Sequence, residues 1–323
     1  MAGLISVICE KIFIGVYIMQ NRYNHLNEYL INKFGERVLK ICIDGGFTCP
    51  NRDGKCGYGG CVFCGEAGSG EHLNFKNSIS EQVRKHLSSY RGERANKFII
   101  YFQNFTNTYG NIEELRKKYD SALIDERIVG LEVATRPDCI TEEIAQLLNS
   151  YKEKYYVVVE LGLQTSNDKT AEIINRGYKS SVFTDAVNIL NKFGIDVVAH
   201  IMIGLPGENE DDLMDTVKFI NAHNIQGVKI HSTYIIKNTK LEEMYMRGEY
   251  KPLELDEYIN LACLAIGNLD KKFIIHRISG DAPKNLLVAP DWNSHKKWIM
   301  NGLDKLLREK DLWQGMKFIN NAQ

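Results

Sequence analysis

The chain has 323 residues, of which 44% are hydrophobic and 25% are charged, and its formal net charge is −1. This composition is typical of a globular protein long enough for one large α/β domain or two smaller ones. The near-neutral charge excludes a global basic field that would recruit nucleic acid. Basic residues outnumber acidic ones in segments 76–97 and 283–323, and each segment is either a phosphate-contacting surface or ordinary solvated helix surface.

Near the start of the chain, an apolar run at 12–19 follows Lys11. It is too short to span a bilayer and lacks a small-residue cleavage site. We interpret residues 1–18 as a non-essential extension, with translation starting at Met19. We therefore expect a cytoplasmic protein with no membrane association, in a reducing compartment that argues against disulfides. The scattered cysteines are interpreted as small buried hydrophobic residues: Cys9, Cys42, Cys139 and Cys263.

From about Arg37 onward, strand-like and helix-like segments alternate. Runs of β-branched and aromatic residues predict strands at 38–44, 98–102, 128–134, 155–163, 195–203 and 227–231. Helical spacing and capping residues predict helices at 80–90, 112–123, 141–151, 167–175, 182–193 and 210–223. Repeated βα units of this kind predict a parallel sheet. Six units are too few for a closed eight-stranded barrel, so we expect a partial (β/α)6 TIM-like barrel with functional residues at the carboxyl ends of its strands.

After Tyr234 the alternation loosens. The sequence predicts a helix at 255–269, a short strand at 273–278 and a closing helix at 296–308. No internal repeat or low-complexity linker separates these elements from the rest. We therefore expect an N-terminal extension and helix at 1–36, a barrel core at 37–235, and a C-terminal α/β elaboration at 236–323 that packs on the core.

Four cysteines lie close together directly after the first predicted strand, at positions 49, 56, 61 and 64. The loop that carries them is rich in glycine, which lets backbone N–H groups approach a bound group closely. Three interpretations are open at this point. Structural zinc would use all four thiolates, although only Cys61 and Cys64 have the usual zinc spacing. An iron–sulfur cluster held by three thiolates would leave one iron free for a cofactor or substrate. Chance clustering of structural cysteines is the third.

The order of motifs along the chain resembles the radical S-adenosylmethionine (SAM) enzymes, and within them the YhcC/YtqA-type family related to the elongator catalytic subunit. The resemblance covers nearly everything after Met19. The segments that carry it are Asp44-Gly-Gly-Phe-Thr-Cys49-Pro-Asn-Arg-Asp-Gly54, Gly59-Gly-Cys61-Val-Phe-Cys64, Tyr101-Phe-Gln-Asn-Phe-Thr-Asn-Thr108, Thr135-Arg-Pro-Asp-Cys139, Glu160-Leu-Gly-Leu-Gln-Thr165, Ile174-Asn-Arg-Gly177, His200-Ile-Met-Ile-Gly-Leu-Pro-Gly-Glu208, Lys229-Ile-His231 and Ile275-His-Arg-Ile278.

The resemblance implies that Cys49, Cys61 and Cys64 ligate a [4Fe–4S] cluster whose fourth iron chelates SAM. Cys56 is left out of the ligand set, because the family need not have a cysteine at its position. One electron from a donor such as flavodoxin or ferredoxin would cleave SAM reductively and generate a 5′-deoxyadenosyl radical. In such chemistry the protein mainly positions the cofactor and excludes competing reactions.

The resemblance also implies which residues hold SAM. Phe63 would pack near the adenine, and Glu160 would bind the ribose hydroxyls, although a strand-end salt bridge is the alternative for this carboxylate. Arg176 would reach the SAM carboxylate with a bidentate fork, or would simply be a helix C-terminal cation before Gly177. The other expected cofactor contacts are Gln103, Asn104, Thr106, Gln164, His200, Gly204 and Pro206.

The substrate is expected to face a second group of residues near the strand ends: Thr135, Arg136, Asp138, Lys229 and His231. The resemblance implies tRNA as the substrate class, and processing of a carboxymethylaminomethyl group on the wobble uridine toward aminomethyl. Trp292, Trp298 and Trp313 are interpreted as packing groups rather than base-stacking platforms. Two alternatives remain open: a radical SAM enzyme acting on a small molecule or peptide, and a non-enzymatic zinc-binding module.

Overall fold

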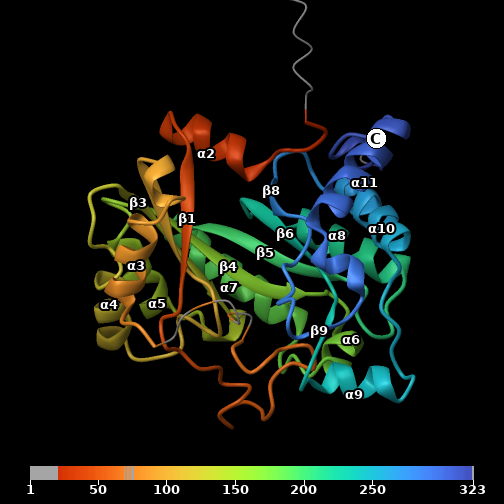
Figure 1. Cartoon of the computed structure of the whole chain (residues 1–323), viewed down its shortest axis with the longest axis horizontal. Helices are drawn as coiled ribbons and strands as arrows, with labels where there is room; N and C mark the ends of the chain where they lie inside the picture. Colours follow the sequence, from red (N-terminus) through yellow and green to blue (C-terminus); the bar gives the residue numbers. More distant parts are fainter. Residues whose placement is uncertain (1–20, 69, 71–72, 74–75, 322–323) are drawn as a thin grey trace, which may run out of the picture.

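The computed structural model describes residues 21–68, 70, 73 and 76–321 (Figure 1), so the interpretations of residues 1–18 and of Cys9 lie outside the described residues. Its central feature is a seven-stranded sheet in the order β1-β2-β3-β4-β5-β6-β8, in which every neighbouring pair is parallel. The sheet curls into a half-barrel, as expected. Its strands are β1 (Val38–Ile43), β2 (Lys97–Phe102), β3 (Ile128–Thr135), β4 (Tyr156–Gln164), β5 (Asp196–Ile203), β6 (Gly227–Ser232) and β8 (Ile274–Arg277).

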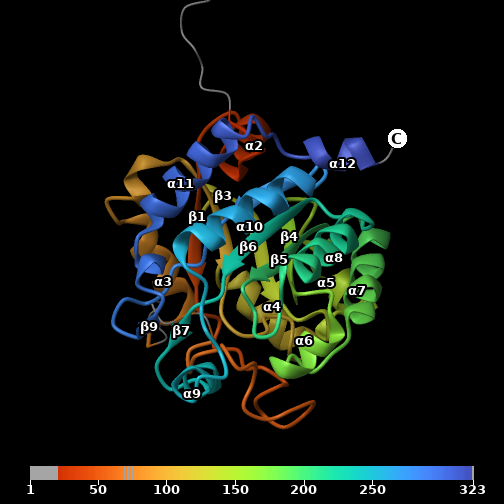
Figure 2. The same cartoon turned by 90° about the vertical axis from the view of Figure 1, so that its right-hand side faces the viewer.

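In chain order the helices are α2 (Leu26–Phe34), α3 (Ile79–Leu87), α4 (Ile112–Asp120), α5 (Glu142–Ser150), α6 (Asp168–Ile173), α7 (Ser180–Lys192), α8 (Glu210–Asn221), α9 (Lys240–Met246), α10 (Leu255–Asn268), α11 (Lys296–Glu309) and α12 (Met316–Asn321). Most of them lie on the outer, convex side of the sheet (Figure 2), whereas α2 contacts both β1 and β8, and α9 lies beside β7 at the mouth of the half-barrel. Several begin where the sequence places a capping side chain. Thr141 accepts a hydrogen bond from the Ile144 amide, and Asn209 accepts from Asp211 and Asp212.

The main hydrophobic core lies between the sheet and these helices. Phe102 of β2 packs edge-on against Tyr119 of α4, and Phe183 of α7 is completely buried. Because such strands are covered by helices outside and by lumen side chains inside, their sequences are nearly continuously apolar. The charged residues inside these strands therefore stand out as candidates for function.

Two features of the sheets were not predicted. The strand predicted near 273–278 is β8, which joins the main sheet beside β6 as a seventh parallel strand. A two-stranded antiparallel sheet of β7 (Ile235–Ile236) and β9 (Leu287–Ala289) was not predicted, because strands of two and three residues carry no periodicity. The expected domain boundaries stay a prediction.

Within the described ranges, no helix has both the length and the apolar character that crossing a bilayer requires.

Candidate functional site

The cysteine loop leaves the carboxyl end of β1 and runs beneath the mouth of the half-barrel, next to α6 and α9 (Figures 1 and 2). Backbone hydrogen bonds attach it there: the Val62 amide donates to Ile174, and the Leu241 amide donates to Val62. A second small hydrophobic cluster around Val62, Leu205 and Leu241 buries the apolar side of the loop. The path of the loop is therefore set by contacts with segments more than a hundred residues away in sequence.

Two polar side chains fix the inside of the loop. Asn51 Nδ2 donates to the Asn175 carbonyl at 2.6 Å, and Asn175 Nδ2 donates back to the Gly60 carbonyl at 2.8 Å. Arg52 Nη2 donates to the Cys64 carbonyl at 2.8 Å. Gly60 has φ +75°, and a Cβ there would come within 2.9 Å of the Arg52 side chain. This position accordingly requires glycine.

Three of the four clustered cysteines face one cavity. Cys49, Cys61 and Cys64 all line a space of about 150 Å³ at the mouth of the half-barrel. Cys56 is exposed and outside the lining, with its Sγ 3.7 Å from Arg136 Nη2. Burial and the neighbouring thiol of Cys64 raise the pKa of Cys61 to about 12. Its thiol thus holds its proton in the free loop, and metal binding would release that proton.

The same cavity gathers many of the predicted contact residues from the carboxyl ends of β3, β4 and β5. Of the expected cofactor residues, its walls include Phe63, Thr106, Glu160, Gln164 and His200. Of the expected substrate residues, they include Thr135 and Arg136. Residues separated by up to 151 positions, Cys49 and His200, therefore meet at one site.

Other predicted residues lie beside the cavity rather than in its lining. Asn104 is buried, and neither atom of its side-chain amide has a hydrogen-bond partner within the described part of the chain. Gln103 is half-buried at the end of β2. Gly204 follows β5 with φ +87°, its carbonyl accepts from Tyr250 at 2.7 Å, and Pro206 lies in the same turn. Asp138 forms a two-point ion pair with Arg136, with N–O distances of 2.7 and 2.9 Å.

Arg176 is not brought to the cavity. Its side chain is completely buried, and its guanidinium donates to three backbone carbonyls, those of Leu163, Thr165 and Tyr178. The Asp168 carboxylate lies 3.4 Å from Nη2. A guanidinium whose donors are used in this way ties the end of β4 to the loop after α6, because leaving such donors unpaired would be costly. Its expected contact with the SAM carboxylate stays a prediction that this environment does not support.

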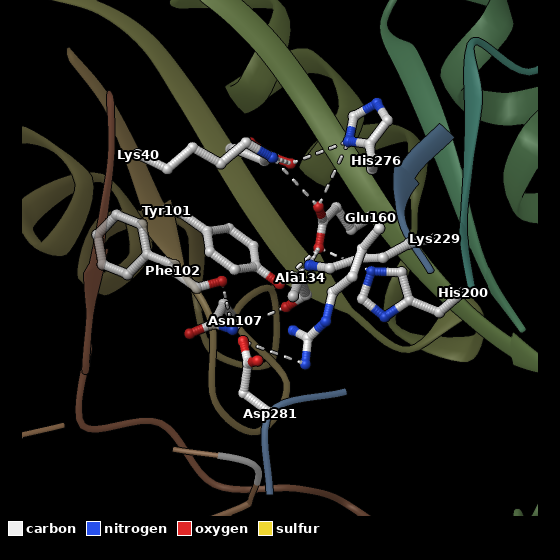
Figure 3. Close-up of polar contacts among 12 residues, drawn as sticks. Lys40, Tyr101, Phe102, Asn107, Ala134, Glu160, His200, Lys229, His276 and Asp281 are labelled. Atoms are coloured by element: carbon white, nitrogen blue, oxygen red, sulfur yellow. Dashed lines mark hydrogen bonds and ion pairs between the residues drawn. The ribbon is translucent and has the colours of Figure 1, made fainter. Parts of the chain in front are cut away.

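Glu160 is completely buried at the centre of a polar network inside the half-barrel (Figure 3). Its Oε2 accepts hydrogen bonds from Tyr101 at 2.5 Å, Lys229 at 2.7 Å and His200 at 2.7 Å. Burial opposes its charge, but the ammonium of Lys229 and the His200 ring hold the pKa of Glu160 well below its ordinary value. The carboxylate is therefore ionised and forms a salt bridge with Lys229, while its expected contact with the SAM ribose stays a prediction.

The far side of Glu160 faces a second group. Its Oε1 lies 3.6 Å from Lys40 Nζ and 3.9 Å from His276 Nδ1. Lys40 also bonds Glu132 Oε1 at 2.5 Å. One oxygen each from Glu132 and Glu160 and one nitrogen of His276 lie within 4.8 Å of one another, which is ligand spacing for a metal ion. Because the Lys40 ammonium already pairs with these carboxylates, the charges are balanced without a metal.

The sequence interpretation missed Lys40, Tyr101, Glu132 and His276. The signal that identified Glu160, a charged residue inside an apolar strand, is also present at Lys40 in β1 and at Glu132 in β3. Each of these charges would be costly to bury alone. Together they form pairs, which only the curvature of the sheet makes possible.

The residues present fit the cofactors that the resemblance implies. Three thiols on one wall of a cavity offer the ligand set of a cluster with one open iron. Thr106 Oγ1 is buried at that cavity with no hydrogen-bond partner among the described residues, so it is available to a polar ligand.

Comparison with known proteins agrees with this geometry. Residues 51–220 match the model of the radical SAM superfamily, and residues 225–309 match the radical SAM C-terminal domain. Among similar proteins are YtqA of Bacillus subtilis, 38% identical over 93% of this chain and 94% of its own length, and YhcC of Escherichia coli K12, 35% identical over 90% and 94%. A tRNA uridine(34) acetyltransferase of Methanocaldococcus jannaschii is 33% identical over 55% of this chain and 32% of its own length.

Among solved structures, Elp3 of Methanocaldococcus infernus superimposes with a TM-score of 0.64 at 22% identity, covering 86% of this chain and 64% of that one. At that identity the likeness supports the fold. Methylornithine synthase gives a TM-score of 0.50 at 14% identity, covering 90% of this chain and 88% of that one. From the two family models and the close relatives, the chain belongs to the radical SAM superfamily, in the YhcC/YtqA-type family related to Elp3.

Proposed function

We propose that this protein is a tRNA-modifying radical SAM enzyme that binds a [4Fe–4S] cluster through Cys49, Cys61 and Cys64. The cofactors, once bound and supplied with one electron by a donor such as flavodoxin or ferredoxin, provide reductive cleavage of SAM and abstraction of a hydrogen atom from the substrate. The substrate we propose is the carboxymethylaminomethyl group of the wobble uridine, processed toward aminomethyl. The observation that carries the proposal is the convergence of these three thiols, without Cys56, on one polar cavity.

In this proposal, the polar network around Glu160 fixes the side chains of the cavity wall. His200 presents one ring nitrogen to Glu160 at the cavity wall, and burial lowers the pKa of the ring. Lys229 and Tyr101 hold the Glu160 carboxylate in one orientation from the opposite strands β6 and β2. Such fixed partners preorganise the lumen wall against which SAM and the substrate would lie.

Two features of the surface support tRNA as the substrate. The basic segments noted in the sequence lie at the two ends of the curved sheet: α3 packs beside β1, and α11 lies on the side of β8 (Figure 1). A polyanion that spans the open side of the half-barrel would pass both. Relatives named tRNA uridine(34) acetyltransferases match 44–55% of this chain.

Trp298 adds to this surface. The packing interpretation is confirmed for Trp292, which is 7% exposed, and is wrong for Trp298, which is 54% exposed. Trp298 stacks on His295 with ring centroids 4.0 Å apart, next to Lys296 and Lys297. An exposed indole flanked by lysines can stack on an unpaired base, as in other single-strand binders.

Anaerobic reconstitution tests the cluster. Wild-type protein should bind iron and sulfide and form 5′-deoxyadenosine from SAM under reduction. Cys49→Ala, Cys61→Ala and Cys64→Ala should each abolish the cluster, whereas Cys56→Ala, the matched control on the same loop, should retain it. Stoichiometric zinc without iron would instead identify a non-enzymatic metal-binding module.

Mass spectrometry of tRNA nucleosides from a deletion strain tests the substrate. We expect carboxymethylaminomethyl uridine to accumulate at the wobble position. An unchanged profile, together with an intact cluster and SAM cleavage, would point to a small-molecule or peptide substrate.

A further inference from the structure

The lumen extends past Glu160 toward the last strands of the sheet. Lys229 of β6 is in register with His200 of β5 on one side and with Arg277 of β8 on the other. Gly162 of β4 is in register with His200 and lines the cavity, so the row begins with a position that has no side chain. Side chains in register on neighbouring strands point to the same face of a sheet. The β6–β8 pairing shifts between Val228 and Lys229, so His276 and Arg277 both reach this side of the sheet, and the charge of Arg277 acts on His200, Lys229 and His231. This row therefore leads from the cavity at Gly162 to the edge of the half-barrel at Arg277.

Both buried carboxylates in the lumen already have an ammonium partner. Lys40 Nζ lies 2.5 Å from Glu132 Oε1. Lys229 Nζ lies 2.7 Å from Glu160 Oε2. Arg277, in register with Lys229, has neither of these carboxylates as a partner, and it adds a positive charge at the edge of the half-barrel.

The guanidinium of Arg277 retains free donors. Its Nε donates to the Ser279 carbonyl. Its Nη2 lies 3.7 Å from Asp281 Oδ2, which is beyond hydrogen-bond distance. Asp281 is itself 61% exposed and is shared with Lys296, 3.5 Å away, so it compensates Arg277 only weakly. In the described part of the chain, no hydrogen bond uses either terminal nitrogen, and the side chain is 23% exposed.

His231 lies next to this free guanidinium. Its ring is 5.1 Å from that of His200, and its buried Nε2 has no hydrogen-bond partner among the described residues. Burial and the charge of Arg277 hold the pKa of His231 well below its ordinary value. A buried ring nitrogen without a protein partner is available to a ligand.

We propose that Arg277, assisted by His231, binds the carboxylate of the modified uridine side chain and so selects a carboxylate-bearing base. The assignment rests on the proposed function, and it adds the group by which that substrate is recognised. A planar guanidinium with two free terminal nitrogens suits bidentate pairing with a carboxylate, which lysine cannot reproduce. Glu160 repels such a substrate only weakly, because the Lys229 ammonium already balances its charge and Tyr101 donates a hydrogen bond to it.

Two tRNAs of identical sequence provide the test, one with carboxymethylaminomethyl uridine and one with methylaminomethyl uridine at the wobble position. The readout is the ratio of their Kd values for cluster-loaded protein at one fixed salt concentration. Phosphate contacts cancel in this ratio. We expect wild-type protein to prefer the carboxylate by about 10- to 100-fold, the usual range for hydrogen bonds to a charged group.

Arg277→Met should bring the ratio close to one, and Arg277→Lys, which keeps the charge but not the fork, should give an intermediate ratio. The matched control is Arg127→Met, since Arg127 lies at the opposite, amino end of the strands and pairs with Asp125. That variant should retain the wild-type ratio. Affinity for SAM should be the same in all four proteins.

Four outcomes would overturn the assignment. Arg277→Met could keep the wild-type ratio, or it could lose affinity for SAM, which would assign Arg277 to the cofactor. Wild-type protein could also convert the carboxylate-bearing tRNA while showing a ratio of one, in which case the proposed function stands and the role of Arg277 fails. Wild-type protein that neither converts nor distinguishes the two tRNAs would refute both.

Discussion

Replacing Lys229 with methionine should strongly destabilise the protein. Lys229 is 6% exposed and bonds the fully buried Glu160 at 2.7 Å. Removing one partner of a buried ion pair leaves an uncompensated charge, which costs about 3–5 kcal/mol of unfolding free energy. With an unfolding entropy of about 2.1 cal/mol/K per residue, this loss lowers the Tm of a chain of this length by about 4–7 °C.

The chain provides a matched control for this perturbation. Lys192 bonds Glu142 at 2.8 Å, close to the distance in the buried pair, but both side chains are about 60% exposed. Solvent screens such pairs, so Lys192→Met should cost no more than about 1 kcal/mol. Differential scanning calorimetry of both variants compares the same chemical change at two degrees of burial. Equal losses of Tm would refute the claim that burial sets the cost.

A double variant identifies the origin of the cost. If the loss comes from the unpaired Glu160 carboxylate, Lys229→Met with Glu160→Gln should recover part of the lost stability.

The stability cost of Lys229→Met should also depend on pH. Because the pKa of Glu160 is lowered in the folded protein, its stabilisation is present above the unfolded value of about 4.3 and is lost as the pH falls below it. The difference in unfolding free energy between wild type and Lys229→Met should accordingly become smaller below about pH 4. A difference that grows there would contradict the reasoning.

Two further predictions concern residues outside this pair. Arg176→Met should lower the free energy of unfolding by about 3 kcal/mol or more, because several backbone carbonyls would lose a charged donor; a variant with wild-type stability that had lost only SAM affinity would restore the role expected from the sequence. Trp298→Ala with Lys297→Ala should weaken tRNA binding and reduce the slope of log K against log salt by about one, in a filter-binding assay. An unchanged slope would place this surface outside the RNA contact.

The sequence alone determined the local elements and their order. Strands such as β4 and β5 are long apolar runs, and helices begin at capping side chains such as Thr141. Both signals come from residues that are close in sequence, so the strands and the helix starts could be predicted. The cysteine spacing belongs to the same class, because the loop that carries the three predicted ligands is only 16 residues long. Local chemistry was sufficient to predict the strands, the helix starts and the clustering of the cysteines, whereas the choice of Cys49, Cys61 and Cys64 as ligands came from the family resemblance.

The tertiary structure decided which side chains meet. Lys40 and Glu132 lie 92 positions apart, and neither has a local signal that names its partner. The position of Arg176 before a glycine is compatible with a ligand contact and with a structural role. Only the backbone carbonyls that accept hydrogen bonds from its guanidinium in the folded protein favour the structural role. β8 joins the sheet because β6 offers it an open edge. The physical reason is common to all three: pairing energy in a low-dielectric interior depends on distances that the fold creates, and one residue's neighbours in sequence do not specify them.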